Sequence, residues 1–233
     1  YQTQYAQNDL ESLGLLKIDF LGLRNLSMIE SVTDLIYKHY HKKVDVYKLP
    51  INDEKTFKLL RESSTTGIFQ LESNGMRQLI KRMHMRTFED IVTVLALYRP
   101  GPMESIQTYL KRRHKKESVS YLTDELKPIL SSTEGILLYQ EQIMAIATEF
   151  AGYSLNEADI LRRAVSKKDE TILKKERANF VKHAVKNKKD ETLAHNIYDY
   201  IVKFANYGFN KSHSVAYAMV AYWMAYLKAN YPA

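Results

Sequence analysis

The sequence predicts a mainly α-helical protein. Apolar residues recur at helical spacing along most of the chain, and residues that favour helix starts precede several of these stretches. A strand-like alternation occurs only within the first thirty residues. Of the 233 residues, 45% are hydrophobic and 26% are charged, and only 8 are Gly and 5 Pro, which excludes collagen-like, low-complexity and broadly disordered proteins.

The first expected element is a short strand at residues 15–20, where apolar and polar residues alternate before Gly22. Lys17 and Asp19 then point to one face of this strand. A long helix is expected to follow, ending at about residue 39.

Capping residues predict where most of the later helices start. A short polar side chain at a helix start accepts a hydrogen bond from a backbone N–H of the first turn. Such residues precede five stretches: Asn52 or Asp53, Ser73, Thr87, Ser154, and Asn210 or Ser212. Further helices are expected at 139–150, after the acids at 169–170, and at about 191–205. The uncharged stretch 214–227 is shorter than the roughly 20 residues that a membrane-spanning helix needs, so we expect a buried core helix there.

Several kinds of site are excluded by what the sequence lacks. There is no Cys, which removes disulfides, Cys-ligated zinc, iron–sulfur clusters and thiol nucleophiles. Neither phosphate-binding glycine motif, G-x-x-x-x-G-K-[ST] or G-x-G-x-x-G, occurs, and H-E-x-x-H is also missing. The first residues have neither an initiator Met nor the pattern of a signal peptide, so we expect a fragment of a longer polypeptide.

Positive charge is concentrated in one segment. The chain carries 34 Lys+Arg against 27 Asp+Glu, and residues 162–189 hold 11 of the basic and 3 of the acidic residues. Smaller basic groups lie at 111–116 and at Arg77, Lys81, Arg82 and Arg86. Such clustering is typical of proteins with a polyphosphate partner, although solvated helix faces look similar.

Three local clusters are candidate sites, each with a structural alternative. Lys17 and Asp19 form either an internal ion pair or part of a catalytic site. The segment 162–168 ends a helix with cations suited to phosphate oxygens, or is a solvated helix end. The segment 207–214 combines an aromatic residue with a helix start that offers free backbone donors, an arrangement that binds anions, although ordinary caps share these residues.

Six stretches closely resemble the C-family replicative DNA polymerases, the family of the bacterial DNA polymerase III α subunits. They follow one another along most of the chain as GLLKIDFLGLRNL, TTGIFQLESNGMRQLIKR, VLALYRPGP, GILLYQEQIM, ADILRRAVSKK and FANYGFNKSHSVAYA. The resemblance implies that residues 1–24 are the end of an α/β palm domain. Residues 25–233 would then belong to a helical fingers domain that continues beyond the last residue.

The resemblance also implies a two-metal nucleotidyl transfer that adds dNTPs to a primer 3′-OH with Mg²⁺ as cofactor. Asp19 matches the third of three metal-binding aspartates, and Lys17 matches an active-site lysine. The other two aspartates would lie upstream of this chain, so the isolated chain is expected to be inactive. We expect the Asp19 carboxylate to face the cations of the later helices across a cleft that holds the nucleotide.

The same resemblance assigns the dNTP-binding residues. The triphosphate would contact Arg162, Arg163, Lys167 and Lys168, and the nucleotide site would further include Arg99, Tyr207, Asn210, Lys211 and His213. The implied partners are primer–template DNA, dNTP, a sliding clamp and other replisome subunits, in the bacterial cytoplasm and away from membranes. Two alternatives remain open: a non-catalytic basic helical module that binds nucleic acid, and a structural helical interaction domain.

Overall fold

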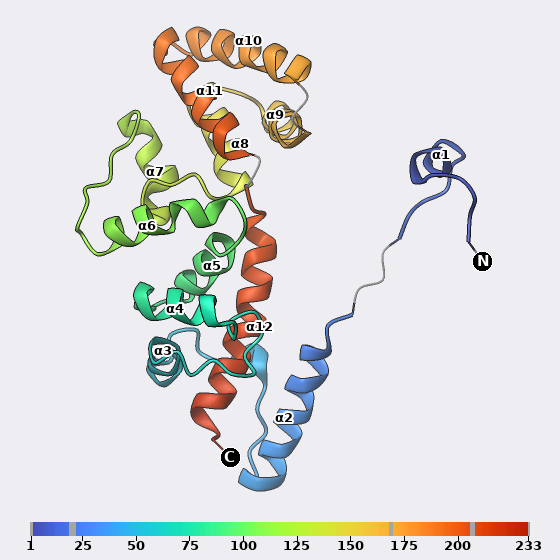
Figure 1. The fold of residues 1–233 in the computed structure, drawn as a ribbon, viewed down its shortest axis with the longest axis vertical. Helices are drawn as coiled ribbons and strands as arrows, with labels where there is room; N and C mark the ends of the chain where they lie inside the picture. Colours follow the sequence, from blue (N-terminus) through green and yellow to red (C-terminus); the bar gives the residue numbers. More distant parts are fainter. Residues whose placement is uncertain (1, 19–21, 168–169, 206–207, 233) are drawn as a thin grey trace. The chain divides into compact units, whose positions relative to one another are not determined.

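Helices make up nearly all the regular structure in the computed structural model, which describes residues 2–18, 22–167, 170–205 and 208–232 (Figure 1). The prediction of a mainly α fold is confirmed. The chain divides into two compact units, Tyr1–Lys43 and Val44–Ala233. None of the helices in these ranges is long and apolar enough to cross a membrane.

The first unit contains two helices, α1 (Gln7–Ser12) and α2 (Arg24–Tyr40). Helix α2 confirms the long helix expected to end near residue 39. The strand predicted at 15–20 does not form at residues 15–18, which are exposed and irregular. A strand is stabilised by hydrogen bonds to a neighbouring strand, and the described part of the chain supplies no such neighbour. Residues 19 and 20 lie outside that part.

The second unit begins with a series of short helices. Their bounds are α3 (Glu54–Arg61), α4 (Asn74–Met83), α5 (Phe88–Leu97), α6 (Ile106–Arg113) and α7 (Lys127–Leu130), with 3-10 turns at Val46–Lys48, Pro102–Ser105, Asp124–Leu126 and Ser131–Thr133. The starts predicted after Asp53, Ser73 and Thr87 are confirmed by α3, α4 and α5. Asp53 accepts from the Thr56 N–H at 2.8 Å, and Ser73 accepts from the Met76 N–H at 3.3 Å.

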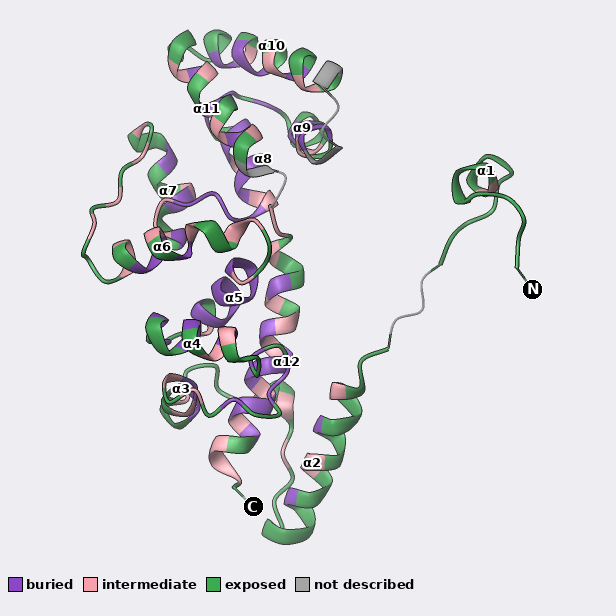
Figure 2. Cartoon of the chain, in the orientation of Figure 1, coloured by how far each residue is buried: buried purple, intermediate pink, exposed green. Residues whose placement is uncertain are grey.

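The long helix α12 (Lys211–Asn230) forms the core of this unit with α5 and α3. Residues 90–97 of α5 are all buried (Figure 2). Close to the start of α12, the buried Ser214 hydroxyl donates to the Val92 carbonyl oxygen at 2.6 Å. The prediction of a buried core helix at 214–227 is therefore confirmed.

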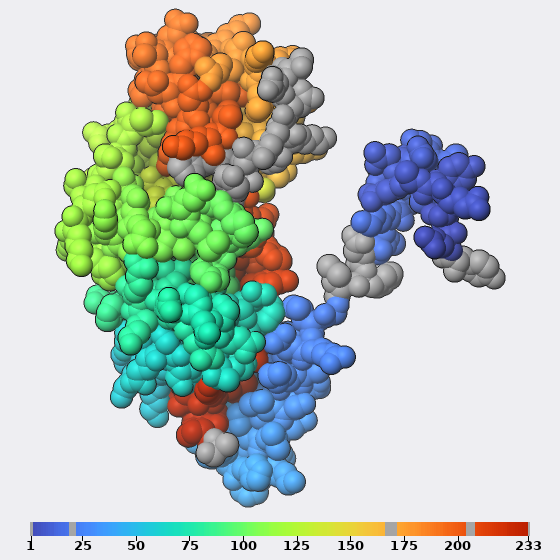
Figure 3. Space-filling view, viewed as in Figure 1, coloured from blue at the N-terminus to red at the C-terminus, as the bar shows by residue number. Residues whose placement is uncertain are grey.

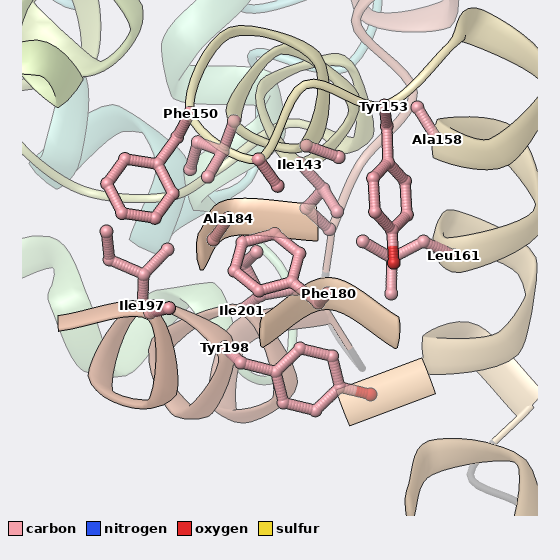
Figure 4. Close-up of a cluster of buried hydrophobic side chains, with 14 of the residues drawn as sticks. Ile143, Phe150, Tyr153, Ala158, Leu161, Phe180, Ala184, Ile197, Tyr198 and Ile201 are labelled. Carbon is pink, nitrogen blue, oxygen red and sulfur yellow. The ribbon is translucent and has the colours of Figure 1, made fainter. Parts of the chain in front are cut away.

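A second core lies among α8 (Gln140–Glu149), α9 (Leu155–Lys167), α10 (Glu170–Lys186) and α11 (Glu191–Ala205) (Figure 4). Phe180 is fully buried at its centre. Its ring stacks on Phe150 at 6.3 Å and meets Tyr198 at 5.7 Å. Such aromatic pairs add directional contacts to the apolar burial of this core.

Candidate functional site

The site is organised by one short backbone pairing between distant segments. The Phe209 N–H donates to the Leu138 carbonyl oxygen at 3.0 Å, and the Gln140 N–H donates to the Phe209 carbonyl oxygen at 2.9 Å. These bonds form an isolated parallel bridge between Tyr139 and Phe209. Helices α8 and α12 both begin directly after this bridge, so their N-termini lie next to each other.

The backbone donors at the start of α12 are already occupied. The Lys211 N–H donates to both carboxylate oxygens of Glu141, at 2.9 and 3.0 Å. The His213 N–H donates to the Asn210 side chain at 2.8 Å, which makes Asn210 the N-cap. The expectation of free donors is therefore wrong for Lys211 and His213, because side chains of this chain supply the acceptors that a helix start requires.

Arg99 and His213 both contact the ring of Phe209. The Arg99 guanidinium lies over the Phe209 ring, 4.2 Å from its centroid. The Phe209 ring meets His213 edge-on at 5.5 Å, and His213 lies 4.0 Å from Tyr217. Tyr217 in turn contacts Phe69 at 5.0 Å. Phe209 thus joins the loop after α5 to the start of α12 through a cation–π contact.

The two arginines of α9 share one carboxylate. Arg162 donates to Asp159 Oδ1 at 2.9 Å from Nε and 2.7 Å from Nη2, and Arg163 donates to Asp159 Oδ2 from Nε at 2.8 Å and also from Nη2. Hydrogen bonds from Arg162 and then Arg163 hold the pKa of Asp159 below its usual value. Arg162 also donates to the Gln140 side chain at 3.2 Å, which links the pair to the Tyr139–Phe209 bridge.

A small cavity of about 230 Å³ lies at the start of α12, with Tyr139, Glu141 and Lys211 among its lining residues. The Lys211 ammonium lies 5.6 Å from the centroid of the Tyr139 ring. A cation, a carboxylate and an aromatic ring therefore border one hollow at the bridge.

The structure brings some of the predicted site residues close together and not others. Arg99, Lys211 and His213 contact residues at or beside the bridge; Arg162 reaches it through Gln140, and Arg163 is tied to Arg162 through Asp159. Asp19, Lys168 and Tyr207 lie outside the described residues, and Lys167 is the last residue of α9. Lys17 is exposed in the first unit.

The predicted site residues did not include the two bridge residues, Tyr139 and Phe209, or the polar contributors Asp159, Gln140 and Glu141. Asp159 precedes the two arginines by three and four residues, the spacing of ion pairs on one helix, so its role was visible in the sequence. Glu141 acts on Lys211 from 70 residues away, and no local pattern signals that contact. Among the described residues, no group of three His, Cys, Asp or Glu could hold a metal ion.

Comparisons with known proteins show which family the chain resembles. Residues 25–188 match the family model described as the bacterial DNA polymerase III alpha subunit finger domain. The chain is 55% identical over 232 residues to the DNA polymerase III subunit alpha of Bacillus subtilis strain 168, covering 100% of this chain and 21% of that protein. It is 52% identical over 230 residues to the proteins of the same name from Staphylococcus epidermidis strain RP62A and Halalkalibacterium halodurans, covering 99% of this chain and 22% and 21% of theirs. The chain thus spans about a fifth of these relatives.

Proposed function

Since the chain belongs to the bacterial DNA polymerase III alpha subunit finger-domain family, we propose that it is the dNTP-binding fingers part of a template-directed DNA polymerase. In this role, it helps to add deoxynucleotides to a primer 3′-OH with release of pyrophosphate. Residues 25–233 are the fingers in this proposal, and residues 1–24 are the end of the palm. The start of the family match at residue 25 supports that boundary.

The observation that carries the proposal is the gathering of cations around the Tyr139–Phe209 bridge. The Arg99 guanidinium lies over the Phe209 ring, the Lys211 ammonium lies 5.6 Å from the centroid of the Tyr139 ring, and His213 contacts Phe209. Arg162 reaches the bridge through Gln140, and Arg163 shares Asp159 with Arg162. A nucleoside triphosphate carries about four negative charges, and guanidinium forks are well suited to its oxygens. Lys167, Lys168, Tyr207 and Asn210 complete the proposed dNTP site.

Asp19 and Lys17 have separate roles in the proposal. Asp19 supplies one carboxylate to a site for two Mg²⁺ ions, whose other aspartates come from outside these 233 residues. Bound metal would activate the primer 3′-OH and stabilise the charge on the transferred phosphoryl group. Lys17 supplies a cation toward the triphosphate.

The dNTP site is tested by measuring equilibrium dNTP binding to the full-length protein. We expect saturable binding that Arg163→Ala and His213→Ala each weaken at least tenfold, because each removes a charged or stacking contact. Arg177→Ala is the matched control: Arg177 also pairs with an aspartate, Asp199, but lies on α10 outside the proposed set. Equal weakening in all three variants would refute the assignment.

The role of Asp19 is tested separately by single-nucleotide incorporation. Asp19→Asn should abolish incorporation while primer–template binding stays within about twofold, because only the metal-binding charge is lost. Near-normal turnover would refute the role. Salt-sensitive DNA binding with no saturable dNTP binding would instead favour the non-catalytic nucleic-acid module.

A further inference from the structure

Two basic groups far apart in the sequence meet at one place in the fold, outside the site described above. His84 directly follows helix α4 and His114 directly follows helix α6, and the two helices contact each other. The surfaces of the two segments border each other in Figure 3. We define the α4–α6 basic patch as the exposed cations beside these helix ends: Lys81, Arg82, Lys111, Lys115 and Lys116.

Side chains of α6 fix the two helix ends together. The His114 Nε2 donates to the Arg82 carbonyl oxygen at 2.8 Å, and the Arg113 Nε donates to the Met83 carbonyl oxygen at 3.0 Å. Arg82 in turn donates from its guanidinium to the Gln107 side chain at 2.7 Å. The last carbonyl groups of a helix carry partial negative charge, so cationic donors stabilise them. These hydrogen bonds hold the two helix ends that carry the patch next to each other.

The described residues supply no carboxylate partner for this patch. The nearby acids are used by other cations: Asp90 pairs with Arg113 at 2.7 Å, and Glu117 pairs with Arg112 at 3.1 Å. Within the ranges that the structure describes, none of the five patch cations forms an ion pair with a carboxylate. In contrast, the α9 arginines share Asp159. The patch keeps its surplus charge available for an external anion.

We propose that the α4–α6 basic patch binds the sugar–phosphate backbone of single-stranded DNA. Several cations spread over one surface match the repeating charge of a strand. The exposed rings of His84 and His114 meet edge-on with centroids 6.1 Å apart, and they offer flat faces for unpaired bases beside the cations. The choice of DNA as the partner rests on the proposed function, whereas the location rests on the charge and geometry of the patch.

The test measures binding of an oligodeoxythymidylate to the full-length protein by fluorescence anisotropy between about 50 and 200 mM salt. The variant is Lys81→Gln/Lys111→Gln/Lys115→Gln. Each phosphate contact to a single strand contributes about 0.7 to the slope of log affinity against log salt. Loss of three contacts should therefore reduce the slope by about 2 and weaken binding roughly 10- to 100-fold.

A matched control distinguishes the effect of the patch from the effect of a lower net charge. The variant Lys55→Gln/Lys58→Gln/Lys127→Gln removes three exposed lysines from α3 and α7, with the same change in net charge. It should bind the oligonucleotide within about twofold of the wild type. Changing the three patch lysines to Arg should preserve binding, because Arg keeps the charge. Matching thermal unfolding of all variants would show that the fold is retained.

Three results would overturn the inference: unchanged binding in the patch variant, equal loss in the control, or a loss seen with duplex DNA and not with the single strand. The dNTP affinity should be unaltered in the patch variant. Failure of the dNTP site would appear as an unaltered dNTP affinity in Arg163→Ala, which does not involve the patch. The two proposals therefore fail in distinguishable ways.

Discussion

At the scale of single residues, two acids of the same chain occupy hydrogen-bond donors of the candidate site. Asp159 binds Arg162 and Arg163, and Glu141 accepts the Lys211 N–H. In the proposed dNTP site, an incoming anion would compete with these carboxylates for the same donors. We therefore expect the acids to influence ligand affinity in the proposed site together with the cations.

Asp159→Asn should strengthen dNTP binding by the full-length protein about two- to fivefold at low salt. The substitution removes a competing negative charge from Arg162 and from the exposed Arg163, and the gain is small because solvent weakens exposed ion pairs. The gain should shrink as salt is added, because salt screens exposed charges. Weaker binding in the variant would mean that Asp159 acts mainly by orienting the guanidinium groups.

Tyr109 should make the protein less stable at alkaline pH. Burial raises the pKa of its phenol to about 12, above the usual value near 10. Between these values the unfolded chain releases the proton and the folded chain keeps it, so stability falls by about 1.4 kcal/mol per pH unit. Urea unfolding should show a shallower alkaline loss in Tyr109→Phe than in the wild type. Parallel curves would show that Tyr109 is not the source.

At the scale of elements, helix starts were the features most predictable from the sequence. Asp53, Ser73 and Ser154 precede α3, α4 and α9, because a capping side chain acts within its own turn. Helices α6 and α7 were not predicted, and neither has a side-chain cap at its start. The strand at 15–20 was predicted from alternation alone, and alternation does not supply a pairing partner.

Asp53→Ala should lower the free energy of unfolding by about 1 to 2 kcal/mol, because the side chain caps α3 and accepts from Asn230 at 3.0 Å. Burial opposes ionisation, but hydrogen bonds from Thr56 and Asn230 hold the Asp53 pKa below its usual value. The charge-dependent part of this contribution is thus complete above about pH 4 and is lost as the pH falls further. Denaturant unfolding at several pH values measures it.

The control for this cap is Asp53→Asn, which keeps the capping oxygen without the charge. It should retain most of the stability at neutral pH, since Asn is also a good N-cap. Its stability should also change less between pH 5 and pH 3, values that bracket the usual pKa of Asp near 3.9. If the stability of Asp53→Asn fell as steeply between pH 5 and pH 3 as that of the wild type, another carboxyl group would be the cause of the pH dependence.

At the scale of the whole molecule, the packing of distant segments is what the sequence did not reveal. The apolar stretch at 214–227 predicted a core helix, but not that it would pack on α5 and α3. The bridge between Tyr139 and Phe209 likewise joins segments 70 residues apart. Such contacts depend on which surfaces meet after the helices form, and no local period encodes them.

Residues 44–233 should fold without residues 1–43. The second unit contains the core around α5 and α12 and the aromatic cluster of α8–α11. We expect the shortened chain to show helical circular dichroism and a single cooperative thermal transition. Broad, non-cooperative melting with strong dye binding to exposed apolar surface would show that the first unit is required.

The attachments of α12 determine how this helix can move. It is tied by Ser214 to Val92, by Tyr222 to the Pro50 carbonyl, by Lys228 to the Thr66 carbonyl and by Asn230 to Asp53. Sliding by one turn, about 5.4 Å, would break all four tethers at once. Any displacement of His213 along the axis of α12 therefore carries the attached helices with it as a rigid body. The N-terminal end of α12 is coupled to α8 in the same way, by the two backbone bonds of Phe209 and by the bonds from the Lys211 N–H to Glu141.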